Sequence, residues 1–249
     1  MKVVLTEMHS ILDAIRTMYM SKRSWTEEKE LELKEIIDVC TDRYGRPLIT
    51  LDSFDFPEKM KFDEECRKLF KWGAKHITML RFLDCSVIVE GLHRGGTDDF
   101  DAHAKRLENR IIRSSTRLAT YETEEISEWY QDKIIPTDIA LAYLGISTPD
   151  TIEYDGNTYV RTTNGYIIKG MENDKDVKRG LYMLSLPMTF TFKVNITELA
   201  HIYKERGSKD GGAHGTAAPE LQIMIEILVD QVNEWYPWIT RELLLEIIN

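Results

Sequence analysis

Residues 195–237 read NITELAHIYKERGSKDGGAHGTAAPELQIMIEILVDQVNEWYP, and this stretch predicts two helices separated by a glycine-rich break. In its first part Leu199, Ile202 and Tyr203 stand at i, i+3 and i+4, which is the spacing of one apolar helix face. Asn195 is a suitable N-cap for that helix, because its side-chain oxygen can accept a hydrogen bond from a free backbone N–H of the first turn. The stretch therefore predicts a helix that begins at Asn195.

Residue types also mark where the first helix ends and where the second helix begins and ends. Arg206 closes the first helix, and Gly207 is a natural stop, because glycine readily adopts the backbone conformations found after a helix. Pro219 falls in the first turn of the second helix, and Pro237 ends it. The apolar face of the second helix is formed by Leu221, Ile225, Leu228 and Val232.

The composition is that of a soluble globular protein of 249 residues, with 43% hydrophobic and 30% charged residues. The net charge of −10 disfavours binding to nucleic acid polymers or anionic membranes, but it allows a small phosphorylated ligand held by local arginines. No apolar run is long enough to cross a membrane, and the first ten residues do not form a secretory signal. Three cysteines without metal-ligand spacing indicate reduced thiols, no metal site and a cytoplasmic protein.

Outside the opening stretch, the sequence alternates between helical and strand patterns. Residues 41–61 are rich in turn-forming residues and are predicted to be an insertion. Asp155-Gly156 and Asn164-Gly165 lie between alternating apolar residues, which predicts an inserted β-meander at 151–170. The remaining patterns predict a strand at 2–6, helices at 10–20, 25–40 and 63–72, one bent strand or two short ones at 77–92, and a turn at 93–97.

The strongest chemical pattern is a series of arginines between Asp99 and Tyr121, a segment predicted to be helical. Arginine binds phosphate well, because its planar guanidinium can donate two parallel hydrogen bonds. An anionic ligand or a solvated, salt-bridged helix face would both explain such a series. The four side chains stand at i, i+4, i+7 and i+11 and would share one helix face: Arg106, Arg110, Arg113 and Arg117.

The C-terminal stretch resembles the flavin-dependent thymidylate synthase (ThyX-like) family. That family has an Asn that starts a helix and an Arg that ends it, followed by a loop and a terminal apolar helix. Asn195, Arg206 and Pro237 match this layout, as do Leu186-Pro187 before it and residues 217–220 at the start of the second helix. The loop in this chain is longer than is usual in the family.

Two further segments carry the resemblance. Residues 14–21 resemble the family's A-x-R-x-x-R-x-S segment, with matches at Ala14, Arg16 and Ser21 and with Tyr19 in place of the second Arg. Residues 73–76 resemble a family segment in which a Gly and a His precede a strand. The resemblance implies that Ser21 lies near a flavin, and it assigns His76 to the same cofactor. A helix-end serine and a structural histidine are the alternative interpretations.

The family signature R-H-R-x-x-S-x-N-E-x-S-x-R-Y is degraded here. In the frame that ends at Tyr121, Arg110 matches a signature Arg that contacts flavin, and Tyr121 matches the final Tyr. Little else matches, and a rival frame at residues 92–97 keeps only H-R-x-x-S/T. We therefore expect a shared fold with a rebuilt substrate pocket.

Taken as a whole, the resemblance implies an α+β fold: one domain over residues 1–249, with a central antiparallel sheet, flanking helices and the two insertions. It implies transfer of a one-carbon unit to C5 of a pyrimidine deoxynucleotide such as dUMP, with FAD as cofactor, methylene folate and NADPH as cosubstrates, and a homotetramer with shared sites. It assigns Arg206 to catalysis and substrate, and it assigns flavin to Ser21, His76, Arg110 and Asn195. The remaining substrate residues would be Arg106, Arg113, Arg117 and Tyr121.

Two alternatives stay open at this point. The first is a non-catalytic relative that keeps the fold and binds nucleotide or flavin. The second is an unrelated helical protein whose arginine stripe meets an acidic partner.

Overall fold

The computed structural model describes residues 1–48, 56–103, 110–113, 128, 137–162, 165–172, 187–208 and 219–248. At 99, 101–103, 110–113 and 137–139 it describes the backbone alone. The chain divides into two compact units. The first contains Met1–Lys2, Glu90–Asp99 and Arg113–Phe190, and the second contains Val3–Val89, Phe100–Ile112 and Thr191–Asn249.

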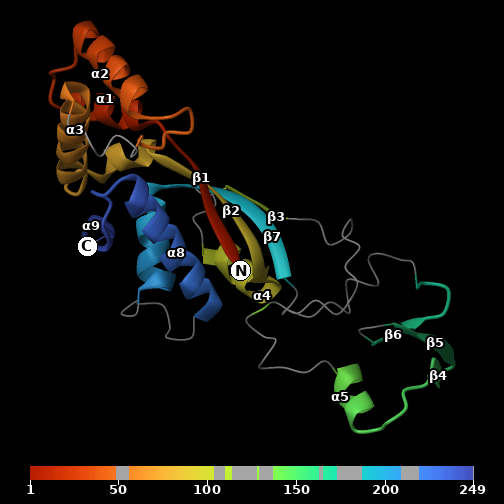
Figure 1. Cartoon of the computed structure of the whole chain (residues 1–249). Helices are drawn as coiled ribbons and strands as arrows, with labels where there is room; N and C mark the ends of the chain where they lie inside the picture. Colours follow the sequence, from red (N-terminus) through yellow and green to blue (C-terminus); the bar gives the residue numbers. More distant parts are fainter. Residues whose placement is uncertain are drawn as a thin grey trace. The chain divides into compact units, whose positions relative to one another are not determined.

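The helices of the second unit begin with three that pack together, α1 (Ile11–Ser21), α2 (Glu27–Cys40) and α3 (Pro57–Gly73) (Figure 1). The side chain of Thr26 caps α2 by accepting a hydrogen bond from Lys29 N, and α3 ends at Gly73. The buried faces include Ile15 and Met18 of α1, Leu33 of α2 and Leu69 of α3, as helical periodicity requires.

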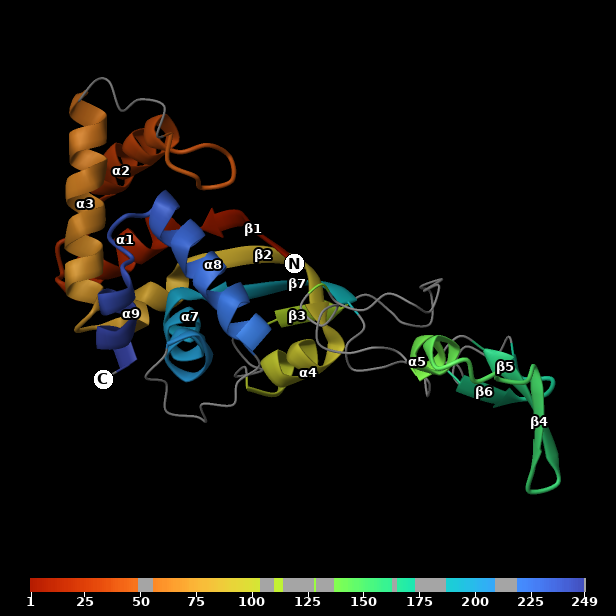
Figure 2. The same ribbon diagram turned by 60° about the horizontal axis from the view of Figure 1, so that its bottom comes forward.

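A four-stranded sheet follows the order β1-β2-β7-β3. Its strands are β1 (Lys2–His9), β2 (Asp84–His93), β7 (Pro187–Asn195) and β3 (Arg110–Arg113). The edge strand β1 is covered by α8 (Pro219–Trp235), which runs beside it (Figure 2). The Gln231 side chain donates a hydrogen bond to Val3 O at 2.8 Å and accepts one from Leu5 N at 2.6 Å. One amide thereby satisfies two backbone groups that an edge strand otherwise leaves to solvent.

The two helices of the opening stretch form as predicted, and the glycine-rich break at 209–218 lies outside the described residues. Helix α7 (Ile196–Ile202) begins after the cap Asn195 and continues into a π-helical turn, η4 (Tyr203–Gly207). All three predicted stripe residues of this helix are buried. The predicted apolar face of α8 is also buried, at Leu221, Ile225, Leu228 and Val232.

The first unit contains the predicted meander. Strands β4 (Thr151–Tyr154), β5 (Asn157–Thr162) and β6 (Gly165–Ile168) form an antiparallel sheet, and Tyr154 pairs with Asn157 across the first turn. Asp155 and Gly156 have φ of 48° and 75°, the positive values that an Asp-Gly hairpin turn needs. A short helix, α5 (Thr137–Tyr143), precedes this sheet.

The helix predicted from Asp99 to Tyr121 is wrong. The chain instead forms α4 (Arg94–His103), which starts where a turn was predicted at 93–97, and then strand β3. Thr97 Oγ1 donates a hydrogen bond to His93 O, and a Cβ at Gly96 would lie 2.7 Å from the His93 ring. The small glycine therefore lets this helix begin directly at the end of the strand. Ile111 and Ile112 favour the strand, because β-branched residues fit a pleated surface.

Three smaller differences complete the fold. Helix α3 starts at Pro57, inside the predicted insertion, because proline is well suited to the first turn of a helix. Residues 77–82 form a 3₁₀ helix, η2 (Ile77–Phe82), instead of a strand. An additional helix, α9 (Arg241–Ile248), follows α8. None of the helices in the described part of the chain is long and apolar enough to cross a membrane.

Candidate functional site

The N-terminal end of α7 is held by Asn195. Its Oδ1 accepts hydrogen bonds from Glu198 N at 2.9 Å and from Thr197 Oγ1 at 2.6 Å. Ile196 N donates to Leu83 O at 3.1 Å, which joins the start of α7 to the segment just after η2. The Asn195 side chain, assigned to flavin by the resemblance, therefore acts as a helix cap within this chain.

The C-terminal end of the same helix widens into the π turn η4. A Cβ at Gly207 would lie 2.7 Å from Ile225 Cγ2 and 2.8 Å from Tyr203 Cδ2, so a side chain does not fit without a shift of these neighbours. Ser208 N donates to Tyr203 O at 2.7 Å and closes the turn. π-Helical turns are uncommon and frequently occur at functional sites.

Arg206 lies in this π turn and is only 6% exposed. Two buried acids, Glu198 of α7 and Glu220 of α8, belong to the same group of helices. A guanidinium in such a low-dielectric environment interacts more strongly with an anion or a carbonyl oxygen than one in water does. The geometry therefore makes Arg206 a candidate ligand-binding residue of the described chain.

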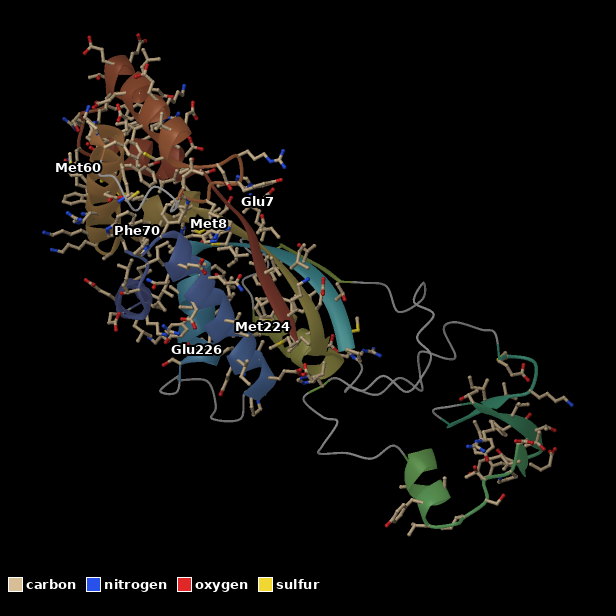
Figure 3. All side chains as sticks on the ribbon, viewed as in Figure 1. Glu7, Met8, Met60, Phe70, Met224 and Glu226 are labelled. Carbon is tan, nitrogen blue, oxygen red and sulfur yellow. The ribbon has the colours of Figure 1, made fainter. Side chains whose placement is uncertain are left out.

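A charged network of Arg241, Glu226 and Asp230, called the brace below, joins α9 to α8 beside the π turn. Arg241 of α9 donates hydrogen bonds to Glu226 Oε2 at 2.7 Å and to Asp230 Oδ1 at 2.6 Å, both on α8. Figure 3 labels Glu226 on this helix. Burial, and then the charge of Glu226, raises the pKa of the buried Tyr203 hydroxyl, while Arg241 lowers it. Helix α9 and Arg241 thus hold α8 beside the turn that carries Arg206.

The sequence prediction missed this brace. The usable signal was Thr240 before the apolar run 243–248, because Thr is a frequent N-cap. Thr240 Oγ1 accepts a hydrogen bond from Leu243 N at 3.2 Å.

The N-terminal segment that resembles A-x-R-x-x-R-x-S is used to hold helices together. Arg16 donates hydrogen bonds to both carboxylate oxygens of Glu30 on α2, and Tyr19 donates to both oxygens of the buried Glu65 on α3. The exposed Ser21 donates to Met18 O at 2.8 Å. The helix-end interpretation of Ser21 therefore describes its contact in this chain.

His76 is exposed and lies directly before η2. Its ring packs on Trp72 with a centroid separation of 4.6 Å, and Lys22 Nζ lies 4.5 Å from the centre of the same Trp72 ring. His76 therefore contacts a residue one helical turn before it in the sequence.

The structure places four of the predicted site residues on two elements. Asn195 and Arg206 stand at opposite ends of one continuous helical segment, so they are about 16 Å apart at 1.5 Å per residue. Arg110 and Arg113 lie on strand β3, which contradicts the four-arginine helical stripe because its spacing requires a helix. The side chains of Arg110 and Arg113 lie outside the described residues, as do Arg106, Arg117 and Tyr121.

No known family's sequence profile matches the chain, and no curated protein matches it by sequence. Its fold does match solved structures. Two structures of thymidylate synthase X (ThyX) from Helicobacter pylori, both with FAD and dUMP, align with TM-scores of 0.51 and 0.55 at 15% and 13% identity. The first alignment covers 98% of this chain and 100% of that chain, and the second covers 97% and 99%.

A third structure is the UMP/dUMP methylase PolB from Streptomyces cacaoi, bound with 5-Br dUMP. It aligns with a TM-score of 0.51 at 10% identity, over 97% of this chain and 93% of that chain. At these identities the similarity shows the fold alone. It confirms, at the level of the fold, the resemblance to the flavin-dependent thymidylate synthases.

Proposed function

We propose that this chain, which has the ThyX fold over nearly its whole length, binds a pyrimidine deoxynucleotide and modifies it at C5 in a flavin-dependent reaction. The observation that carries the proposal is the fold match to ThyX with FAD and dUMP and to a UMP/dUMP methylase. Methylene folate as one-carbon donor, NADPH as reductant and a homotetrameric assembly belong to the same proposal.

Arg206 is the residue of this chain that we assign to the nucleotide. It is buried in a π turn whose shape depends on Gly207, and the brace of Arg241 supports the neighbouring helix. A preorganised donor in a water-poor site stabilises negative charge on a bound base or phosphate better than a mobile surface arginine does. The resemblance gives Arg206 this role in binding and catalysis.

The cysteines support chemistry that does not use a protein thiolate. Cys66 and Cys85 are fully buried, and burial raises the pKa of both thiols. Burial and the charges of Asp63 and Glu58 raise the pKa of Cys40 to about 11. All three groups are therefore protonated at neutral pH and are poor nucleophiles.

The described side chains of one chain do not by themselves fit a flavin. Ser21 and Asn195 make local helix-end hydrogen bonds, and His76 packs on Trp72. We therefore place the proposed flavin site between copies of the chain. A bound flavin would supply the hydride for reduction of the transferred one-carbon unit.

Two measurements test the proposal. The purified protein should be yellow, with a visible flavin absorption band, and it should release tritium from C5-tritiated dUMP in the presence of methylene folate and a reductant. UMP serves as a parallel substrate, because one structural neighbour is a UMP/dUMP methylase. A protein that neither binds flavin nor releases tritium from either nucleotide would contradict the proposal.

Arg206→Ala should abolish nucleotide binding or reduce turnover by at least about 100-fold, the effect expected from loss of a preorganised charge-stabilising donor. The circular dichroism spectrum should remain that of the folded protein. Lys34→Ala, at an exposed position of α2, is the control. Unchanged binding and turnover in the Arg206 variant would remove this residue from the site.

A non-catalytic relative is the second candidate function. It is favoured by the N-terminal segment, where Arg16, Tyr19 and Ser21 contact neighbouring backbone and side chains of the same chain. Flavin or dUMP binding without tritium release would establish it. The third interpretation, a helical interaction protein, required the arginine stripe that strand β3 contradicts.

A further inference from the structure

A cavity lies within the second unit, and none of its lining residues belongs to the Arg206 turn. Its volume is about 270 Å³, and its walls come from the end of α2, the loop that follows, the start of α3 and the turn after α8. Pockets for drug-sized ligands usually measure about 300–1,000 Å³, so this cavity suits a smaller molecule.

The walls of the cavity are mostly apolar and include four aromatic rings. These belong to Phe56 and Phe62, at the start of α3, and to Trp235 and Trp238, at and just after the end of α8. Trp238 is held in place by stacking on Phe70, with ring centroids 6.3 Å apart and planes inclined by 13°. Figure 3 labels Phe70 on α3. Flat rings fixed in this way favour a flat guest, because aromatic pairs gain energy beyond simple area burial.

The charged groups at the cavity disfavour an anion. Asp63 and Glu234 line it together with one cation, Lys59, which pairs with Asp63 at 3.6 Å. Arg46 pairs with Glu234 at 3.5 Å, but both side chains are at least half exposed, so this pair is weak. Burial and then the charges of Asp63 and Glu58 raise the pKa of the Cys40 thiol, which also lines the cavity, while Lys59 lowers it.

We propose that this cavity binds a flat, two-ring aromatic molecule that is uncharged or cationic, at a site separate from the proposed nucleotide site. The guest would lie among the rings of Trp235, Trp238, Phe56 and Phe62, with any amino group near Asp63. None of these residues belongs to the Arg206 turn, so this proposal does not depend on the proposed C5 chemistry.

Tryptamine and indole-3-acetate test the proposal, because they share one ring system and carry opposite charges. Isothermal titration calorimetry of the full-length protein should show one saturable tryptamine site per chain. Indole-3-acetate should bind at least about tenfold more weakly, a change in Kd that calorimetry resolves. Absence of saturable tryptamine binding, or equal affinity for the two compounds, would overturn the proposal.

Two tryptophan substitutions locate the site. Leu48 lines the cavity and is 38% exposed, so Leu48→Trp should block it without disturbing the core and should weaken tryptamine binding at least about tenfold. Leu31→Trp, at a 62% exposed position of α2 that does not line the cavity, should bind like the wild type. Equal binding by both variants would show that tryptamine sits elsewhere. Both variants should keep the tritium release of the wild type, whatever its level.

Discussion

Gly45 shows how a single residue ties the insertion loop to the sheet. Its φ is +77°, and a Cβ placed there would lie 1.7 Å from Met8 O on β1. On either side of it, Met8 N donates to Tyr44 O, and the buried Tyr236 hydroxyl donates to Gly45 O, each at 2.9 Å. Glycine suits this position for two reasons: the backbone is left-handed, and it lies too close to another strand for a side chain.

Gly45→Ala should therefore lower the free energy of unfolding by about 2–4 kcal/mol, since backbone strain and a backbone clash add. Urea unfolding followed by circular dichroism measures this. Gly156→Ala is the control, because Gly156 has a similar φ of +75° but no atom within 4 Å of the added Cβ. The control should lose only about 1 kcal/mol. Similar losses in both variants would mean that the contact with Met8 relaxes freely.

Glu30 is a second residue with a measurable signature. Hydrogen bonds from Arg16 and then Lys34 lower its pKa from 4.5 to about 2. A carboxylate whose pKa is lowered on folding adds stability that is fully present above pH 4.5 and is lost as the pH falls toward 2. Glu30→Gln should thus flatten the acid limb of the stability curve over this range.

Thermal unfolding at a series of pH values tests this prediction. Glu28→Gln, an exposed position on the same helix, is the control and should keep the wild-type acid limb. If the wild type and Glu30→Gln lose stability in parallel below pH 4.5, the Arg16–Glu30 pair does not contribute in solution.

Among the elements, the π turn η4 is the one most closely tied to function. Gly207→Ala places a methyl group against Ile225 and Tyr203, whose side chains must move to admit it. We expect dUMP turnover to fall at least about tenfold, because a displacement near 1 Å of a positioning group has large kinetic effects. Stability should fall by only about 1–2 kcal/mol, a typical cost of overpacking.

Hydrogen exchange monitored by mass spectrometry locates the effect of Gly207→Ala. Exchange should increase in peptides that cover residues 203–207 and remain unchanged in those from α1–α3. Gly145→Ala is the control, because no atom lies within 4 Å of a Cβ at that glycine and its φ of +69° limits the cost to local backbone strain. Unchanged turnover with faster exchange would separate the turn from the proposed site.

Elements with strong local signals were predicted correctly from the sequence. The cap at Asn195, the apolar face of α8 and the Asp-Gly turn of the meander all depend on neighbours within a few residues. Strand β3 was missed because its structure depends on pairing with β7, about 80 residues further along the chain. Its four residues carry no alternation that would oppose a helical interpretation.

At the scale of the whole molecule, the fold was predictable through a family resemblance that local patterns alone would not supply. The site was predictable only in part. Arg206 is buried by packing between helices, which local spacing does not indicate, whereas Ser21, Asn195 and His76 contact groups within four residues of themselves. A contact between any of these residues and a ligand depends on the folded assembly and not on local spacing.

Copies of the chain are proposed to combine into sites that take residues from more than one subunit. Asn195, assigned to flavin, and Arg206, assigned to the nucleotide, are about 16 Å apart along one helical segment. In the proposed assembly each site is shared between subunits, because symmetric association brings elements of different chains together. If Arg110 and Arg206 of one site belong to different chains, two separately inactive variants should complement each other.

Arg206→Ala and Arg110→Ala should therefore be co-expressed with different affinity tags, and the mixed oligomer should be purified through both tags. In a randomly mixed assembly about one quarter of the sites would receive both intact arginines, so tritium release should recover to about that fraction of the wild type. Recovery requires mixing during assembly, so pooled but separately assembled variants are the control. A mixed oligomer as inactive as its parents would place both arginines of each site in the same chain.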